Sequence, residues 1–162
     1  MTGSIGFRLA TPSDVEEIVA VFTACWRVSY AAVLPEPAIT AMTDDRARGL
    51  WRDALQRAGV VTELAVRDEQ VLGIVRYDVS EGIVHSLYVS PHAQGLGLGT
   101  ALLDQAVASL RAAGRTDARL WVFAANAGSI GFYGSRGWLP DGVQRVEAEF
   151  GEPELQLRKA WR

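Results

Sequence analysis

Three glycines at alternate positions stand directly before an apolar helical pattern, in the segment SPHAQGLGLGTALL (residues 90–103). The first turn of a helix has amide N–H groups without intrahelical partners and carries a partial positive charge. Because glycine has no Cβ atom, a ligand can approach such a backbone closely. Gly95, Gly97 and Gly99 therefore predict an anion site at a helix start, where phosphate is the usual ligand. The alternative is a glycine-rich turn that packs closely on a sheet.

Two common phosphate motifs do not fit this segment. A P-loop needs a lysine after its last glycine, whereas Gly99 is followed directly by Thr100. A dinucleotide fingerprint needs a third glycine where Leu102 and Leu103 stand, and an acidic residue at the end of the next strand, which Asp117 instead precedes. The sequence thus disfavours both nucleotide triphosphate hydrolysis and dinucleotide binding.

Hydrophobic periodicity predicts the elements that position this segment. We expect strands near residues 6–10, 61–68, 70–80, 82–90, 118–124, 138–149 and 154–160. We expect helices over 12–26, near 50–58, over 98–113 and over 126–136, with Thr11 as a cap for the first. Residues 31–43, which contain Pro35 and Pro37, predict a loop or short turn. This order combines an antiparallel meander with a βαβ crossover, so we predict an α/β (α+β) fold with a mixed sheet of about seven strands and about four helices.

Length and composition predict one domain over residues 1–162. The chain has 162 residues, 49% of them hydrophobic, and contains no internal repeat or linker. Its formal net charge is −3, with both signs interspersed. The short basic stretch at Arg158, Lys159 and Arg162 is interpreted as a solvated last strand and tail, so no nucleic-acid partner is expected.

Cysteine usage and hydropathy indicate a cytoplasmic protein without a membrane partner. Cys25 is the single cysteine in the sequence, which rules out an internal disulfide and fits a reducing compartment. The N-terminal residues MTGSIGFRLATPSD lack the pattern of a signal peptide. No stretch approaches the roughly 20 apolar residues that span a bilayer.

The glycine segment resembles the acetyl-CoA motif of the GNAT N-acetyltransferase superfamily. That motif is Gln/Arg-x-x-Gly-x-Gly/Ala after a strand, and here it reads QGLGLG over residues 94–99. A second pattern of the family is an asparagine, then a helix with Phe-Tyr, then Gly-aromatic. The segment NAGSIGFYGSRGW supplies it with Asn126, Phe132, Tyr133, Gly137 and Trp138. The two patterns in order are highly specific, and the resemblance covers the whole chain; one departure is Ser129, where the family usually has alanine.

The resemblance implies that acetyl-CoA lies where two neighbouring parallel strands splay apart. The backbone of Gln94, Gly95, Leu96, Gly97, Leu98, Gly99 and Thr100 would hold the pyrophosphate. Strand residues Leu87, Tyr88 and Val89 would pair with the pantetheine arm. Asn126, Ser129, Phe132 and Tyr133 would complete the cofactor site, although Asn126 is also a preferred helix cap.

The implied reaction is direct attack of a neutral primary amine on the thioester, through a tetrahedral intermediate. A backbone N–H near Leu87 or Tyr88 can stabilise the developing oxyanion. Tyr133 is the candidate proton donor to the departing thiolate, whose thiol should have a pKa of about 8.5. The alternative is that Tyr133 only packs.

Two residues are candidates for the base that takes the amine proton. Residues Ile83, His85 and Leu87 share one side of a regular strand, and histidine has an unperturbed pKa near 6.5. Glu81 lies in the turn before that strand. The alternatives are that His85 is a packing residue, also available for acceptor contact, and that Glu81 is solvated.

The acceptor site is expected near Trp26 and Tyr30, which are four residues apart on one helical face. In the superfamily, the region between the first helix and the second strand often walls the acceptor pocket; the alternative is that Trp26 belongs to the core.

The acceptor is a small-molecule or peptide amine of unknown identity, and a homodimer is compatible with the family. No metal site is expected, because the two histidines and one cysteine show no ligand spacing. Two alternatives to this function remain. The protein is a non-catalytic acyl-CoA sensor or interaction module, or it is an enzyme that uses longer acyl-CoAs or hydroxyl acceptors.

Overall fold

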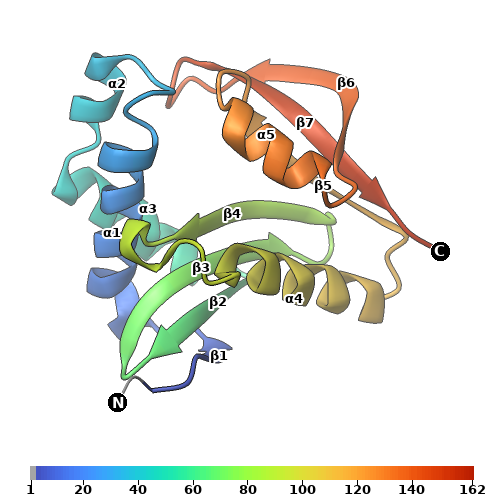
Figure 1. Cartoon of the computed structure of the whole chain (residues 1–162), viewed down its shortest axis with the longest axis horizontal. Helices are drawn as coiled ribbons and strands as arrows, with labels where there is room; N and C mark the ends of the chain where they lie inside the picture. Colours follow the sequence, from blue (N-terminus) through green and yellow to red (C-terminus); the bar gives the residue numbers. More distant parts are fainter. Residues whose placement is uncertain (1–2) are drawn as a thin grey trace.

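The computed structural model describes residues 3–162, in which seven strands form one mixed sheet in the order β1-β2-β3-β4-β5-β7-β6 (Figure 1). The strands are β1 (Gly6–Leu9), β2 (Val60–Arg67), β3 (Gln70–Asp78), β4 (Ile83–Val89), β5 (Asp117–Phe123), β6 (Leu139–Val146) and β7 (Pro153–Ala160). The helices are α1 (Val15–Ala24), α2 (Glu36–Ala41), α3 (Asp44–Gln56), α4 (Leu98–Ala112) and α5 (Ala127–Gly134). The predicted mixed sheet of about seven strands flanked by helices is confirmed.

Strands β1 to β4 form the predicted antiparallel meander. The β2–β3 connection is a tight turn in which Asp68 and Glu69 have φ of 50° and 67°. Positive φ at both central residues is typical of a hairpin turn whose twist matches that of its strands. In the β3–β4 connection the residue with positive φ is Gly82, at 70°, a conformation that glycine adopts readily.

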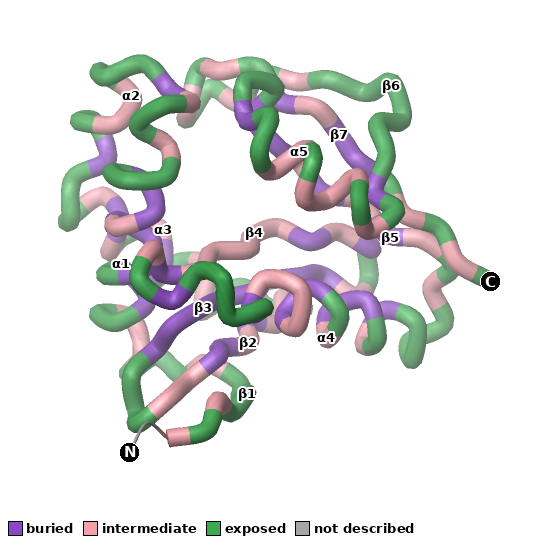
Figure 2. The backbone as a smooth tube through the Cα atoms, viewed as in Figure 1, coloured by how far each residue is buried: buried purple, intermediate pink, exposed green. Residues whose placement is uncertain are grey.

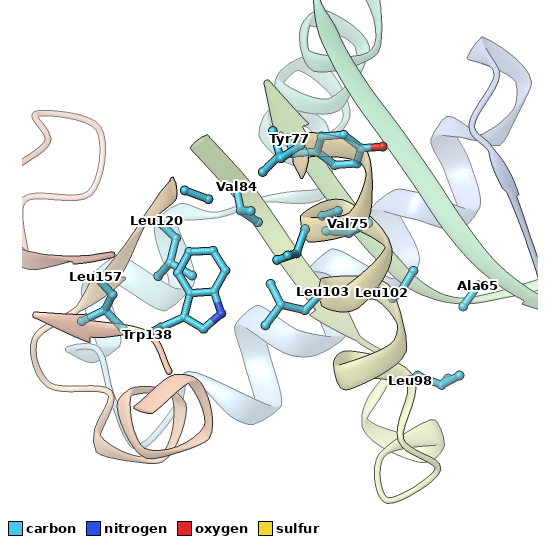
Figure 3. Close-up of a cluster of buried hydrophobic side chains, with 14 of the residues drawn as sticks. Ala65, Val75, Tyr77, Val84, Leu98, Leu102, Leu103, Leu120, Trp138 and Leu157 are labelled. Atoms are coloured by element: carbon cyan, nitrogen blue, oxygen red, sulfur yellow. The ribbon is translucent and has the colours of Figure 1, made fainter. Parts of the chain in front are cut away.

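Two hydrophobic clusters cover the two faces of the sheet, and β3 contributes to both. Ile74 packs with residues of α1 and α3, whereas Val75 packs with residues of α4. Figure 3 shows the second cluster, in which Trp138 lies among Leu120, Leu157 and Leu103. Figure 2 shows the resulting burial along the tube, with buried stretches in β3 and α4 and an exposed β6 at the far edge.

Strands β4 and β5 are parallel neighbours that pair only at their beginnings. The paired residues are Ile83 with Arg119 and Val84 with Leu120. Beyond them the strands part, while β5 continues to pair with β7. The splayed strand pair expected from the sequence is therefore present, and Figure 1 shows the separation between the ends of β4 and β5.

Residues 31–43 differ from the predicted loop, because they include the six-residue helix α2. Pro35 is its N-cap residue and Pro37 lies in its first turn. Proline is tolerated there because the first amides of a helix have no intrahelical acceptor. Before this segment, α1 continues as a π-helical turn over Cys25–Ser29. Within residues 3–162, no helix is both long enough and apolar enough to cross a membrane.

Candidate active site

A cavity of about 600 Å³ opens where β4 and β5 part. Its walls come from both sheet halves and from three helices. Aromatic side chains form much of the lining, and charged side chains of both signs complete it. The lining residues used below are Trp26, Tyr30, Trp51, Arg57, Arg76, Glu81, His85, Leu87, Tyr88, Asn126, Ser129, Tyr133, Arg145, Glu147, Phe150 and Glu154.

The glycine segment forms an open backbone surface at the start of α4. Gly97 is the N-cap residue of α4 in a left-handed conformation with φ of 78°, and Gly95 has φ of 85°. A Cβ atom at either position would meet nothing within 4 Å. The amide of Ala101 makes the first helical bond, to the Gly97 carbonyl, so the amides of residues 98–100 precede the helical ladder. Amides without intrahelical acceptors at a helix start fit a phosphate group, as the sequence predicts.

Helix α5 brings Asn126 and Tyr133 to the cavity. The Asn126 Oδ1 accepts a hydrogen bond from the Ser129 amide at 3.1 Å, so the predicted cap is present. Burial raises the pKa of Tyr133 well above its ordinary value, and the hydroxyl keeps its proton. Phe132 points elsewhere: a Cβ added to Gly99 would lie 3.4 Å from its ring. Tyr133 thus lines the cavity, whereas the adjacent Phe132 contacts α4 at Gly99.

A β-bulge in β4 changes which residues share a face. Arg76 pairs with Ser86 and Tyr77 pairs with Val84, which leaves His85 as the extra residue of β4. Leu87 consequently joins the same hydrophobic cluster as Val84. The expectation that Ile83, His85 and Leu87 lie on one side is wrong, because strict alternation holds only for a strand without a bulge.

The chain is similar in sequence to a known protein family and in fold to solved structures. A model of the acetyltransferase (GNAT) family matches residues 15–138 of the chain. The chain belongs to the GNAT family. The GNAT fold is also seen in the crystal structure of PaiA N-acetyltransferase from Thermoplasma acidophilum in complex with coenzyme A, with a TM-score of 0.82, 19% identity and coverage of 98% of this chain and 99% of that chain.

Two curated relatives share shorter segments with this GNAT chain. An uncharacterized N-acetyltransferase of Methanocaldococcus jannaschii is 36% identical over 63 residues, which are 39% of this chain and 27% of the relative. The mycothiol acetyltransferase of Beutenbergia cavernae is 40% identical over 76 residues, which are 47% of this chain and 25% of the relative. The matched segments therefore span about a quarter of the length of these two relatives.

The cofactor of GNAT proteins is acetyl-CoA, and the residues present fit it. The open amides before Ala101 suit its diphosphate. Beyond Val84, the edge of β4 that faces β5 has no strand partner within the described residues, so an amide-bearing chain can add there like a strand. The amides at the start of α4 and the edge of β4 are features of the structure itself and do not depend on the family match.

Arg136 is a residue of this GNAT site that the sequence analysis missed. Its guanidinium donates two hydrogen bonds to Thr100 Oγ1, at 2.7 and 3.0 Å, and its Cζ lies 3.8 Å from the centroid of the Phe132 ring. The positive charge therefore stands beside the open amides of α4. Arg136 lies within the second GNAT pattern, NAGSIGFYGSRGW, and this position was the signal in the sequence that could have identified it.

Burial and neighbouring charges weaken His85 as a proton acceptor. Desolvation, Arg76 and Arg57 lower the pKa of His85 to about 4. Its Nε2 is buried and has no hydrogen-bond partner in the described part of the chain. Potential proton-accepting atoms of Asp78, Glu81 and His85 lie within 4.8 Å of one another, so the structure brings the two predicted candidates together.

We expect His85 to make the protein less stable as the pH falls from about 6.5 to about 4. In this window the unfolded state binds a proton at His85 that the folded state excludes, so the unfolded state is favoured. The free energy of unfolding, measured by urea titration across this range, should fall less steeply for His85→Gln than for the original chain. Parallel curves for the two proteins would contradict the lowered pKa.

Glu154 is a second residue that the sequence analysis missed. It is buried in the cavity wall, and its Oε1 accepts a hydrogen bond from Arg145 Nε at 3.2 Å. Burial raises the pKa of Glu154, and Arg145 offsets part of this effect. A glutamate with a raised pKa is a better proton acceptor near neutral pH than an ordinary one.

The predicted pair Trp26 and Tyr30 is in contact, with ring centroids 5.2 Å apart. Trp26 is buried in the core cluster, which agrees with the alternative interpretation, yet it also lines the cavity. Its Nε1 donates to the Ala38 carbonyl at 3.2 Å and so fixes α2 against the site. Phe150 packs on Trp26 from the β6–β7 connection, at 5.4 Å between centroids.

We expect two substitutions of Asn126 to separate its cap from cofactor contact. Asn126→Ala removes the acceptor for the Ser129 amide and should lower the free energy of unfolding by about 1 kcal/mol. Asn126→Asp keeps that acceptor but removes the amide donor, so it should retain stability and weaken coenzyme A binding. Thermal melting and calorimetric titration measure the two effects. If both variants bind coenzyme A with unchanged affinity, Asn126 acts only as a helix cap.

Proposed function

We propose that this protein is an acetyl-CoA-dependent N-acetyltransferase that acetylates a primary amine bound in the cavity between β4 and β5. The observation that carries the proposal is the parting of these strands after Val84 and Leu120. Tyr133 lines the gap, and the glycine segment that leads into α4 follows the end of β4. Bound acetyl-CoA supplies an activated acetyl group.

The proposed cofactor contacts come from three elements. The backbone of residues 94–100 binds the diphosphate, with Arg136 adding positive charge nearby. Residues 87–89 of β4 bind the pantetheine arm through their main chain. Asn126 and Ser129 border the same arm from α5, and Phe132 holds α5 against α4 at Gly99.

Protons are moved by side chains in the cavity wall. Tyr133 keeps its proton at any working pH, so its hydroxyl can donate to the leaving sulfur. In this proposal, a backbone amide near Leu87 or Tyr88 donates a hydrogen bond to the acetyl oxygen. We propose Glu154 ahead of His85 and Glu81 as the acceptor of the amine proton, because burial raises the pKa of Glu154 and lowers that of His85.

A binding titration and a thiol-release assay test the proposal together. Calorimetry with coenzyme A should give saturable one-site binding. Thiol release from acetyl-CoA should then rise with at least one amine in a panel of amino acids, polyamines, aminoglycosides and peptide N-termini. Binding without release for every amine would favour a non-catalytic acyl-CoA sensor, and absence of binding would reject both functions.

A further inference from the structure

One wall of the cavity contains a guanidinium that the protein itself does not neutralise. Arg76 lies in the middle of the sheet, on β3, where it follows Ile74 on the face that packs against α1 and α3. Its Cζ is 6.0 Å from the centroid of the Trp51 ring. Its Nε is buried without a hydrogen-bond partner, and within residues 3–162 it forms no ion pair.

Arg76 is half-buried, and partial burial without an ion-pair partner is unfavourable for a cation relative to water. Within residues 3–162, no carboxylate of the cavity wall, Asp53 and Glu81 included, forms an ion pair with Arg76. Glu147 and Glu154 are paired with Arg145. Arg57, in contrast, lies close enough for its charge to lower the pKa of Arg76 further, in addition to the effect of burial. Two arginines of like charge thus line one region of the cavity.

We propose that Arg76, assisted by Arg57, binds a carboxylate of the acceptor, so that the acceptor is a small amino acid or a related amino carboxylate with an apolar side chain. A guanidinium matches a carboxylate with paired hydrogen bonds, which would satisfy the buried donor. The surrounding aromatic rings, including Trp51 and Tyr88, suit an apolar side chain. This inference rests on the proposed function, whose site it shares.

The size of the acceptor follows from the sheet geometry. Arg76 pairs across the ladder with Ser86, which directly precedes Leu87, the proposed binding position for the acetyl oxygen. Neighbouring strands are about 4.8 Å apart and successive residues about 3.3 Å apart. The backbone of Arg76 is therefore close to that of the proposed reaction centre, and the Arg76 side chain lines the same cavity. An amine and a carboxylate on one small molecule reach both, whereas polyamines would place further positive charge beside the two arginines.

The first experiment measures binding and requires no turnover. Hydrocinnamate, which is phenylalanine without its amino group, is titrated calorimetrically against the full chain, with and without coenzyme A. The matched neutral probe is hydrocinnamamide. We expect hydrocinnamate to bind at least about tenfold more tightly, as a charge-assisted pair in a buried site requires. Equal affinities of the two probes, or no binding of either, would overturn the inference.

The second experiment changes the arginine. Arg76→Gln should remove the preference for hydrocinnamate, and Arg76→Lys should restore part of it, while coenzyme A affinity stays unchanged. The matched control is Arg52→Gln, an exposed arginine of α3 outside the cavity, which should keep the preference. Because Arg76 has no internal partner, Arg76→Gln should melt at the same temperature or higher. A clearly lower melting temperature, or a preference that survives the change, would contradict the proposed role.

The third experiment separates this inference from the proposed function. Thiol release is compared for phenylalanine and phenethylamine, which differ by the carboxylate alone. A lower KM for phenylalanine that Arg76→Gln abolishes supports both proposals. Release with equal KM for the two amines keeps the N-acetyltransferase and rejects the carboxylate site. Carboxylate-dependent binding without release in any amine rejects the proposed function and keeps the anion site.

Discussion

Replacement of Gly97 by glutamate is expected to abolish coenzyme A binding, with a loss of affinity of ~100-fold or more. Gly97 has φ of 78°, where a residue with a Cβ atom costs roughly 1–2 kcal/mol. The new carboxylate would also stand at the N-terminus of α4, in the place proposed for the diphosphate, and would repel it. Calorimetric titration with coenzyme A measures the effect directly.

Gly114→Glu is the matched control for this prediction. Gly114 lies beyond the opposite end of α4, has φ of 89°, and has nothing within 4 Å of an added Cβ atom. The control therefore has the same backbone cost and the same added charge, about 25 Å away along the helix. It should melt at a lower temperature but bind coenzyme A normally. Similar affinities of the two variants would mean that the glycine segment does not bind the diphosphate.

Replacement of Tyr133 by phenylalanine is expected to lower turnover by at least about tenfold, since positioned proton donors contribute roughly 10²–10⁴-fold. The ring stays in the cavity wall, so coenzyme A affinity should hardly change. The loss should appear in kcat at saturating acceptor, because the proposed proton transfer takes place during the reaction and not during binding. The thiol-release assay gives kcat for both proteins.

Tyr77→Phe is the control for the loss of a buried hydroxyl. Tyr77 donates to Glu63 Oε1 at 2.9 Å and is not among the residues that line the cavity. This variant should lose stability and retain kcat. If Tyr133→Phe also retains kcat, Tyr133 is a packing residue and another group protonates the leaving sulfur.

The sequence predicted the architecture well because local signals and hydrophobic periodicity agreed. The helix start at Gly97 and the cap at Asn126 depend on neighbouring residues alone, and both were predicted at the correct positions. The parting of β4 and β5 was implied by family resemblance, since periodicity does not report where two paired strands separate. Helix α2 was missed because Pro35 and Pro37 are usual helix breakers, although both suit a helix start.

The predicted site was less complete, because its missing members depend on contacts between distant segments. The bulge at His85 arises from the register between β3 and β4, which a single strand does not encode. Arg76 and Glu154 lie in strands far apart in sequence, and each becomes a candidate only through burial beside the same cavity. The lowered pKa of His85 likewise depends on burial and on the charges of Arg76 and Arg57, so the unperturbed value was a poor guide.

The two residue pairs between β4 and β5 have a consequence for amide hydrogen exchange. With so short a ladder, the segment β5–β7–β6 is joined to the rest mainly through side chains, around Trp138 on one face (Figure 3) and around Phe123 and Phe150 on the other. It can therefore open as a separate cooperative unit, with faster exchange than the β2–β3–β4 meander. A molecule bound between β4 and β5 would link the meander to the β5–β7–β6 segment. The slowest-exchanging amides of the two units should therefore have similar exchange rates when that molecule is bound and different rates when it is not.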